Sequence, residues 1–319
     1  MPRRGCSSAM LGDGCGTARF RRLAPPASSE GRSRSATFSS SLATISEPLV
    51  SHLPTVAIVA SFLVLPTAVA LLTSRDVRAW LRGTGSIRQT LSNAGVGVVF
   101  LVTQLLSRGT LLAAFAGLAA LVPWKLPHEP LAYVLVFVLL DFVYYVQHRL
   151  EHGVPLLWAI HAVHHQSRDY NLSVSFRVGA LSSISTLFFH SVLALAGVSV
   201  ATYAGVVTVH ATILFTLHAR TKLTLGPGRF FNAPAFHRVH HGAEPIYIDK
   251  NFGGVLLVFD RVFGTFAPYR TEPTFGVVGE KAPQEPLAAN VAPFVALLED
   301  VRREKAFVGK VRALFVRAR

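Results

Sequence analysis

Long apolar stretches separated by short polar segments make up the middle of the chain. They cover residues 53–72, 91–123, 131–146 and 178–217. A helix of about 20 apolar residues crosses the hydrocarbon core of a bilayer, so each stretch predicts at least one membrane helix. The last is long enough for two helices, with a turn at Gly197 and Ser199. The pattern predicts an all-α integral membrane helical bundle with four or five membrane segments.

Interruptions and charges refine this bundle. The 91–123 stretch is too long for one helix perpendicular to the membrane, so it either tilts or continues as an interfacial helix. The loop at 75–88 carries four arginines and a single acidic residue, which places it on the cytoplasmic side. The third span and the 178–217 hairpin then end on that side, where the His-rich sequence forms a cytoplasmic helical cap. One conflict stays open. With that loop inside, the span before it places the N-terminal tail outside, although the tail is basic too.

Composition supports the membrane assignment. Of the 319 residues, 51% are hydrophobic and 15% are charged, and the mean hydropathy is +0.43. Soluble domains carry about 25% charged residues, which argues against a soluble enzyme. The net charge of +14 could serve nucleic acid or an anionic membrane surface, and the hydropathy favours the membrane. Cys6 and Cys15 both precede the apolar stretches, so a metal in the body must be held by His, Asp or Glu.

Four segments follow from these patterns. Residues 1–50 are a disordered Arg/Ser-rich tail, interpreted as a transit peptide, an overextended gene start or a plain tail. Residues 51–130 hold the N-terminal membrane spans, 131–270 form a domain with the remaining spans and most of the histidines, and 271–319 are a C-terminal extension. Within the extension, Glu299–Arg319 reads as a basic amphipathic helix that either lies on an anionic leaflet or is solvated.

Histidines gather in three clusters near the ends of the predicted spans. The first has the spacing HxxxH, and the other two have the spacing HxxHH. The clusters are His148 and His152, then His161, His164 and His165, and finally His237, His240 and His241. Residues at i, i+3 and i+4 share one face of a helix, so each cluster presents its rings together. Imidazole suits Zn, Cu, Fe and Ni, and eight rings exceed the coordination of one ion, so a site for two metal ions is expected.

Other polar residues fall near these clusters. Asp141 shares a helix face with His148 inside an apolar span, where an ionisable residue is by default functional. We expect it to orient a ligand imidazole rather than to bind metal itself. His218, at the end of the last hairpin, is the best candidate for a ninth ligand, and His210 is a weaker one. Three isolated histidines are interpreted as structural or interfacial, namely His52, His128 and His190.

The three clusters resemble the motifs of the fatty acid hydroxylase / sterol desaturase superfamily. The members of this superfamily are membrane non-haem di-iron enzymes. The resemblance covers about residues 130–270, and it implies that the segment 131–270 is a fatty acid hydroxylase-like catalytic domain. Within it, His164–Ser173 and Asn232–Gly242 are most similar to the alkylglycerol monooxygenase branch. Ala219-Arg220 departs from that branch, which has an acidic residue there, and this puts the branch's cofactor and substrate in doubt.

This resemblance implies a chemistry for the site. The eight clustered histidines and His218 would ligate two Fe ions, and O₂ with external electrons would hydroxylate or desaturate a C–H bond of a lipid. The lipid would be an alkylglycerol ether, a fatty acyl chain or a sterol. The donor would be tetrahydrobiopterin or a ferredoxin- or cytochrome-type protein. Asn171 would help position a ligand or oxygen, and Asp249 and Asn251 would hold the last cluster in register.

Two other functions compete with a lipid oxygenase. A His-rich metal transporter needs ligands along a pathway inside the spans, whereas these clusters lie at span ends. A zinc-dependent membrane hydrolase needs a carboxylate base such as the Glu of HExxH, and Glu151 instead directly precedes His152. We therefore expect a multi-pass oxygenase with no nucleic-acid partner. A bacterial inner membrane is favoured over the endoplasmic reticulum, with the His site on the cytoplasmic face.

Overall fold

A computed structural model describes most of the chain after residue 85. The described residues are 86–127, 129–221, 230–279 and 282–316. All of them belong to one compact unit. In this part of the chain every regular element is a helix, joined by loops that contain two isolated β-bridges. The all-α class is confirmed for these residues.

Several predictions from the sequence fall elsewhere in the chain. The tail at 1–50, the span at 53–72 and most of the 75–88 loop lie outside the described residues. The same holds for His52 and His128. These expectations therefore stay predictions.

The longest element is α3, Ile87–Ala120, which runs unbroken through the Ser107-Arg108-Gly109 interruption. It begins where the Ser86 hydroxyl accepts a hydrogen bond from the Gln89 backbone N–H, as an N-cap does. At a rise of about 1.5 Å per residue, 34 residues extend over about 51 Å. This exceeds the roughly 30 Å apolar core of a bilayer, so α3 is long enough to tilt or to continue past that core.

Three more helices complete the apolar part, namely α4 Pro130–Gly153, α6 Ser182–Leu195 and α7 Val200–Leu217. The turn predicted at Gly197 separates α6 from α7, with φ at +86°, a conformation that glycine adopts freely. By length and composition, α3, α4 and α7 can cross a membrane, whereas α6 is shorter, at 14 residues. The described residues therefore hold three candidate spans, and the count of four or five for the chain stays a prediction.

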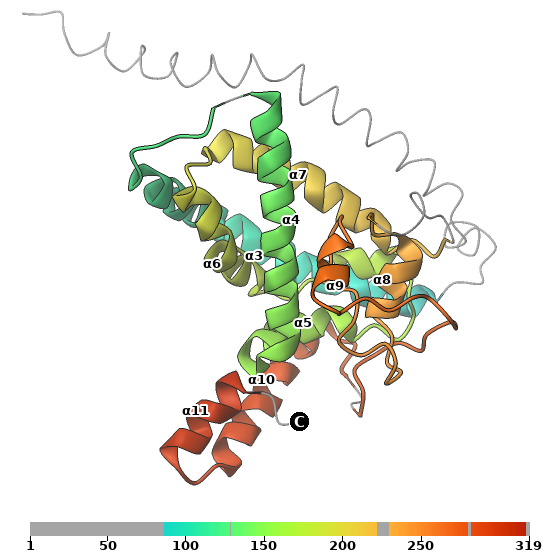
Figure 1. Cartoon of the computed structure of the whole chain (residues 1–319). Coiled ribbons are helices and arrows are strands. Elements are labelled where there is room, and N and C mark those ends of the chain that lie inside the picture. The colour runs from blue at the N-terminus through green and yellow to red at the C-terminus, as the bar shows by residue number, and fades with distance from the viewer. Residues whose placement is uncertain (1–85, 128, 222–229, 280–281, 317–319) are drawn as a thin grey trace, which may run out of the picture. The chain divides into compact units, whose positions relative to one another are not determined.

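These four helices share one apolar core. Its buried side chains include Phe115 of α3, Leu140 of α4, Leu193 of α6 and Val206 of α7. Figure 1 shows α4 passing across α6 and α7, with α5 (Pro155–His165) packed at its C-terminal end. This core lies at one end of the four-helix bundle. The opposite ends of the four helices can therefore carry polar side chains.

Short helices and loops form a cap at those polar ends. They are η1 Leu172–Phe176, α8 Pro234–His240 and α9 Val258–Val262. The fully buried Arg177 ties this cap to α3, because its guanidinium donates to the Ser92 hydroxyl at 3.0 Å. The same guanidinium donates to the Val163 carbonyl at 2.8 Å and to the Gln166 side chain at 2.9 Å. One side chain thus joins α3, α5 and the loop that follows α5.

The C-terminal extension differs from its prediction. The expected single helix over Glu299–Arg319 is divided between the end of α10, Pro286–Arg303, and α11, Phe307–Phe315. The backbone is extended at Glu304 and Ala306, which lets α11 turn back against α10 and α5. The prediction was wrong because packing against α5 favours a hairpin over one continuous helix.

Candidate metal centre

All nine histidines predicted as ligands come together at the cap. Their ring nitrogens form two groups, in each of which the candidate ligand atoms lie within 4.8 Å of one another. The five-histidine group contains His148, His152, His161, His165 and His240. The four-histidine group contains His164, His218, His237 and His241. The helices α4, α5 and α8 supply seven of these residues, and His218 and His241 are the C-caps of α7 and α8.

Each HxxHH cluster contributes to both groups. On α5, His161 and His165 belong to the five-histidine group and His164 to the other. On α8 the pattern is reversed, since the middle histidine, His240, belongs to the five-histidine group and its two neighbours do not. Positions i+3 and i+4 differ by about 100° around a helix axis, so one helix can direct rings into two adjacent sites.

Backbone carbonyls hold four of the rings by Nδ1. In the five-histidine group, His148 Nδ1 lies 2.8 Å from the Phe252 carbonyl oxygen, and His240 Nδ1 lies 2.9 Å from that of Lys250. In the four-histidine group, His164 Nδ1 lies 2.9 Å from the Arg177 carbonyl oxygen, and His218 Nδ1 lies 3.3 Å from that of Leu214. A carbonyl oxygen only accepts, so the proton of each neutral ring lies on Nδ1. The Nε2 atom is then left with a lone pair, which is the form in which imidazole binds a metal.

Two carboxylates hold rings of the five-histidine group in the same way. His161 Nδ1 lies 3.1 Å from the buried carboxylate of Glu151, and His152 Nδ1 lies 3.5 Å from the half-exposed carboxylate of Asp249. In the four-histidine group, the Nδ1 partners found in the described part of the chain are backbone carbonyls. The two groups therefore differ in charge, because only the first is backed by carboxylates.

The spacing of the Nε2 atoms fits a cation in each group. Neighbouring Nε2 atoms are 3.1–3.2 Å apart in the five-histidine group and 3.0–3.2 Å apart in the other. Unprotonated nitrogens at this distance repel each other unless a cation lies between them. Two nitrogens about 2.1 Å from one ion, at an angle of about 90–100°, would be about 3.0–3.2 Å apart. The buried Nε2 of His240 has no hydrogen-bond partner, as a metal-ligating atom would.

Burial keeps these rings neutral. It lowers the pKa of five histidines of the cap well below 6.5, and neighbouring imidazoles lower it further. These five are His164, His165, His237, His240 and His241. Burial also lowers the pKa of His218 to about 4. Because a neutral imidazole is the ligand form, the donor set fits two metal ions near pH 7.

Residues 133–265, which contain all nine histidines, match the family model described as fatty acid hydroxylase. This part of the chain is a fatty acid hydroxylase domain. It lies within the segment 131–270 that the sequence predicts to be catalytic.

Named relatives are similar over a wider region. The chain is 33% identical over 221 residues to an alkylglycerol monooxygenase of Danio rerio, which covers 66% of this chain and 49% of that protein. It is 29% identical over 259 residues to the Homo sapiens protein of that name, which covers 78% and 57%. An ornithine lipid hydroxylase of Rhizobium tropici is 29% identical over 170 residues, 48% of each chain. The chain spans about half the length of these curated relatives, and no solved structure matches it.

Asp141 of the fatty acid hydroxylase domain lies apart from both histidine groups. Its carboxylate accepts hydrogen bonds from His210 Nε2 at 2.7 Å and from the backbone N–H groups of Val255 and Leu256 at 2.7 and 2.8 Å. The expectation that it orients a ligand imidazole is not met by these contacts. The reason is depth, because the seven residues from Asp141 to His148 along α4 rise about 10 Å. Asp141 instead fixes the loop after Gly254, and His210 serves as its partner.

Asn171 lies at the N-cap of η1. Its side-chain oxygen accepts a hydrogen bond from the Ser173 backbone N–H at 2.9 Å, and its amide donates to Asp169 at 3.4 Å. These contacts give it a structural role in the turn after α5. Catalytic roles for Asp141 and Asn171 stay predictions.

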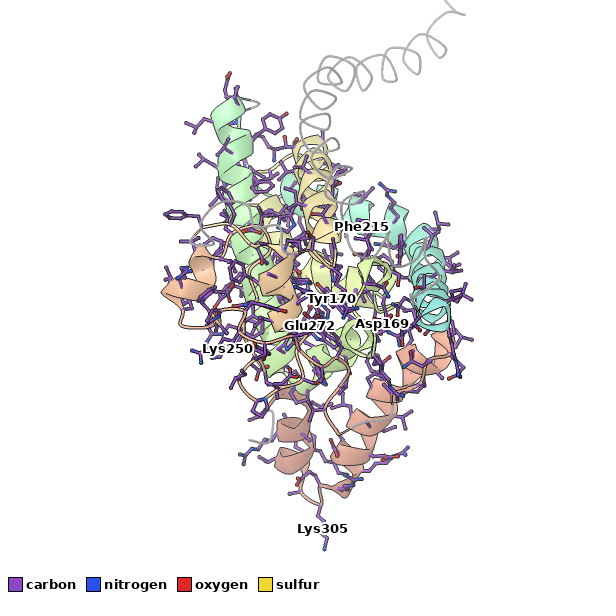
Figure 2. All side chains as sticks on the ribbon, turned by 90° about the vertical axis from the view of Figure 1, so that its right-hand side faces the viewer. Asp169, Tyr170, Phe215, Lys250, Glu272 and Lys305 are labelled. Atoms are coloured by element: carbon purple, nitrogen blue, oxygen red, sulfur yellow. The ribbon has the colours of Figure 1, made fainter. Side chains whose placement is uncertain are left out.

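The departure at Arg220 is compensated from a distant segment of the chain. Arg220 lies 3.8 Å from Asp169 and 3.4 Å from Glu272, and Glu272 also accepts from Arg238 at 3.3 Å. Figure 2 shows Asp169 and Glu272 on either side of Tyr170, whose ring stacks on that of His218 at 5.9 Å. Glu272 therefore places a carboxylate beside Arg220, so this edge of the domain keeps an acidic residue despite the departure.

Glu151 is the supporting residue that sequence reasoning missed. It is 5% exposed, and its carboxylate accepts hydrogen bonds from Gln147 at 2.9 Å and from Ser185 at 2.7 Å, besides its contact with His161. The signal in the sequence is a carboxylate inside the HxxxH cluster itself. The HExxH pattern draws attention to Glu151 only as a hydrolase base, whereas in the structure it is the partner of His161 on α5, the first HxxHH helix.

Replacing Glu151 by Gln is expected to weaken metal binding by the five-histidine group. The amide keeps the shape of the side chain and removes the charge that supports His161, a change that typically costs about 10–100-fold in metal affinity. Chelator titration of the iron-loaded protein should show one weakened ion and one ion unchanged. Glu299→Gln, on the exposed side of α10, is the matched control. Equal weakening of both ions would contradict the assignment of Glu151 to one group.

Proposed function

We propose that this protein is a membrane-bound di-iron oxygenase that uses O₂ and two external electrons to hydroxylate a C–H bond of a lipid. The observation that carries the proposal is the convergence of nine imidazoles into two adjoining groups that share both HxxHH helices. Bound iron would supply the ability to activate O₂. The names of the relatives, a monooxygenase and a lipid hydroxylase, support the same reaction class.

The protein's own residues would prepare the site for this reaction. The Nδ1 contacts fix six of the nine rings, so the lone pairs of these six point inward before a metal arrives. Glu151 and Asp249 make the five-histidine group the more negative of the two, and we infer that it holds its ion more tightly. Tyr170 packs against His218 and His241 and donates to the Leu217 carbonyl at 3.0 Å, which excludes water from the four-histidine group.

The apolar helices support a lipid as the substrate. The cap lies at the ends of α4 and α7, two of the candidate spans, so a C–H bond could be delivered along them from the bilayer. We propose an alkylglycerol ether lipid as the first substrate to test, with acyl lipids and sterols as alternatives. Electrons would come from a reduced pterin or a redox protein, and the His site would face the cytoplasm of a bacterial inner membrane. A metal transporter lacks support because the nine rings lie at helix ends rather than along a span. A zinc-dependent hydrolase lacks support because Glu151, the carboxylate of the HxxxH cluster, is engaged by Gln147, Ser185 and His161.

Growth under ¹⁸O₂ is expected to place one labelled oxygen atom in a lipid of cells that contain the protein. Untargeted lipid profiling of cells with and without the gene would find a labelled hydroxyl, or a labelled aldehyde if an ether bond is cleaved. A new double bond without label would identify a desaturase instead. A purified protein that holds only zinc and consumes no O₂ with any of these lipids would refute the proposal.

A further inference from the structure

A groove of about 450 Å³ lies between α3, α6 and α7, in the apolar part of the domain rather than in the cap. Its wall is mostly apolar and includes Leu112, Phe115, Leu187 and Val207. Figure 1 shows α6 beside α3, which it contacts. The rim residues Leu101 and Ala204 are exposed, and none of the nine candidate metal ligands lines the groove. Because α3 and α7 are candidate spans, membrane lipids would surround this groove.

One charged side chain lines the groove. Arg108 lies on α3 and is exposed, and it takes part in none of the ion pairs found among the described residues. The described wall of the groove also contains no acidic residue. An ionisable side chain on a membrane helix is costly unless a partner compensates its charge. An anion bound in the groove would supply that partner.

The N-terminus of α6 lies in the same groove and also favours an anion. This helix begins at Ser182 without a side-chain cap, because its N-cap residue is Leu181. Uncapped N–H groups and the helix dipole make such an end positive. In the first turn, Ser183 is only 8% exposed, and its hydroxyl has no hydrogen-bond partner within the described part of the chain. Ser183 lines the groove, so this buried hydroxyl points to an acceptor atom on a ligand.

The packing of α3 brings Arg108 to the level of this helix start. The Thr103 hydroxyl donates to the Ala180 carbonyl at 3.1 Å, which fixes α3 beside the residues that precede α6. Arg108 follows rather more than one turn later, and side chains on a helix lean toward its N-terminus. Gln104, which also lines the groove, adds an amide donor between them. The donors therefore gather at the end of the groove that lies next to the cap.

The rest of the groove suits a hydrocarbon chain. From Gln104 to Phe115, α3 rises about 16 Å, and one leaflet contributes about 15 Å to the apolar core of a bilayer. At the far end, the ring of Tyr203 stacks on that of Phe115 at 4.3 Å. We propose that the groove binds one anionic phospholipid, with its phosphate held by Arg108 and the N-terminus of α6 and one chain along α3. This inference depends on α3 and α7 lying in a membrane and not on the reaction at the metal centre.

The headgroup is tested by native mass spectrometry of the full chain in detergent, with equal amounts of phosphatidylglycerol and phosphatidylcholine. One phosphatidylglycerol per chain is expected to be retained in preference to phosphatidylcholine. Arg108→Gln should raise its dissociation constant about fivefold or more, the effect of one arginine beside an anionic headgroup. Arg88→Gln is the matched control, because Arg88 is an exposed arginine of the same helix outside the groove wall. Equal retention of the two lipids, or an equal loss of affinity in the two variants, would overturn the proposal.

The chain is tested by thermal unfolding in detergent. A lipid that binds only the folded protein raises its apparent Tm, so phosphatidylglycerol should stabilise the protein in a concentration-dependent way. Ala204→Phe, in the wall of the groove, should remove this rise because the new ring occupies the space of the chain. Ala201→Phe should keep it, since Ala201 is an exposed residue of α7 outside the wall. Glycerol 1-phosphate has the phosphate but no chains and should not compete. Competition by it, or the same rise in both variants, would overturn the proposal of a lipid.

Discussion

Replacing His240 by Ala is expected to abolish lipid oxidation and to remove one of two bound ions. The His240 ring is held by the Lys250 carbonyl at Nδ1, and its buried Nε2 is directed to no protein partner. It is the ligand that α8 contributes to the five-histidine group. The metal content should fall from about two ions per chain to about one. Losing a residue that only supports a ligand costs up to about 100-fold in activity, so losing a ligand itself should cost more than that.

His190 provides a closely matched control. His190 is 4% exposed and His240 is 3% exposed. The Nδ1 atom of His190 also has one partner, the Tyr203 hydroxyl at 2.9 Å, and its Nε2 atom is also buried without a partner. Both substitutions to Ala therefore remove a buried imidazole and one hydrogen bond. His190→Ala should keep two ions per chain, because its ring belongs to neither histidine group. If the two variants lose the same amount of iron, then loss of packing rather than loss of a ligand explains the result.

Sequence spacing could identify the nine histidines but not the way they are divided. Helical periodicity places the rings of one HxxHH cluster on one face, and the structure brings every one of them to the cap. The division depends on how α5 and α8 face each other, and nothing in the spacing states that relation. His164 and His240 hold the same middle position in their clusters, yet they belong to different groups.

Supporting residues were harder to predict for a related reason. Four rings are held by backbone carbonyls, which any residue type provides, so the sequence carries no signal for Phe252 or Lys250. Asp141 showed the opposite problem, because a carboxylate in an apolar helix is conspicuous whether it serves a metal or a loop. The apolar helices themselves were predictable, since their length and composition are local properties of the chain.

Replacing Asn251 by Ala is expected to destabilise the cap strongly. Its fully buried amide donates to the carbonyls of Phe236 and Ala267 at 3.0 and 2.8 Å, and its oxygen accepts from the Ala267 N–H at 2.8 Å. Leaving three buried partners unsatisfied costs about 1–3 kcal/mol each. We therefore expect a loss of about 3–9 kcal/mol and a fall in the apparent Tm of about 10 °C or more in detergent.

The position of Asn251 couples this loss to metal binding. Its neighbours Lys250 and Phe252 supply the carbonyls that hold His240 and His148, and φ at Asn251 is +55°, in the left-handed region. Asn251→Gly relieves the backbone strain that Ala would suffer, about 1 kcal/mol, and still loses all three hydrogen bonds. Both variants should therefore bind iron more weakly, with Gly slightly more stable than Ala. Asn290→Ala, which loses one hydrogen bond from the Ala180 N–H and one to the Pro286 carbonyl, should leave iron affinity unchanged. If Asn251→Ala lowers Tm no more than Asn290→Ala, the loop at 249–252 does not hold the two rings in place.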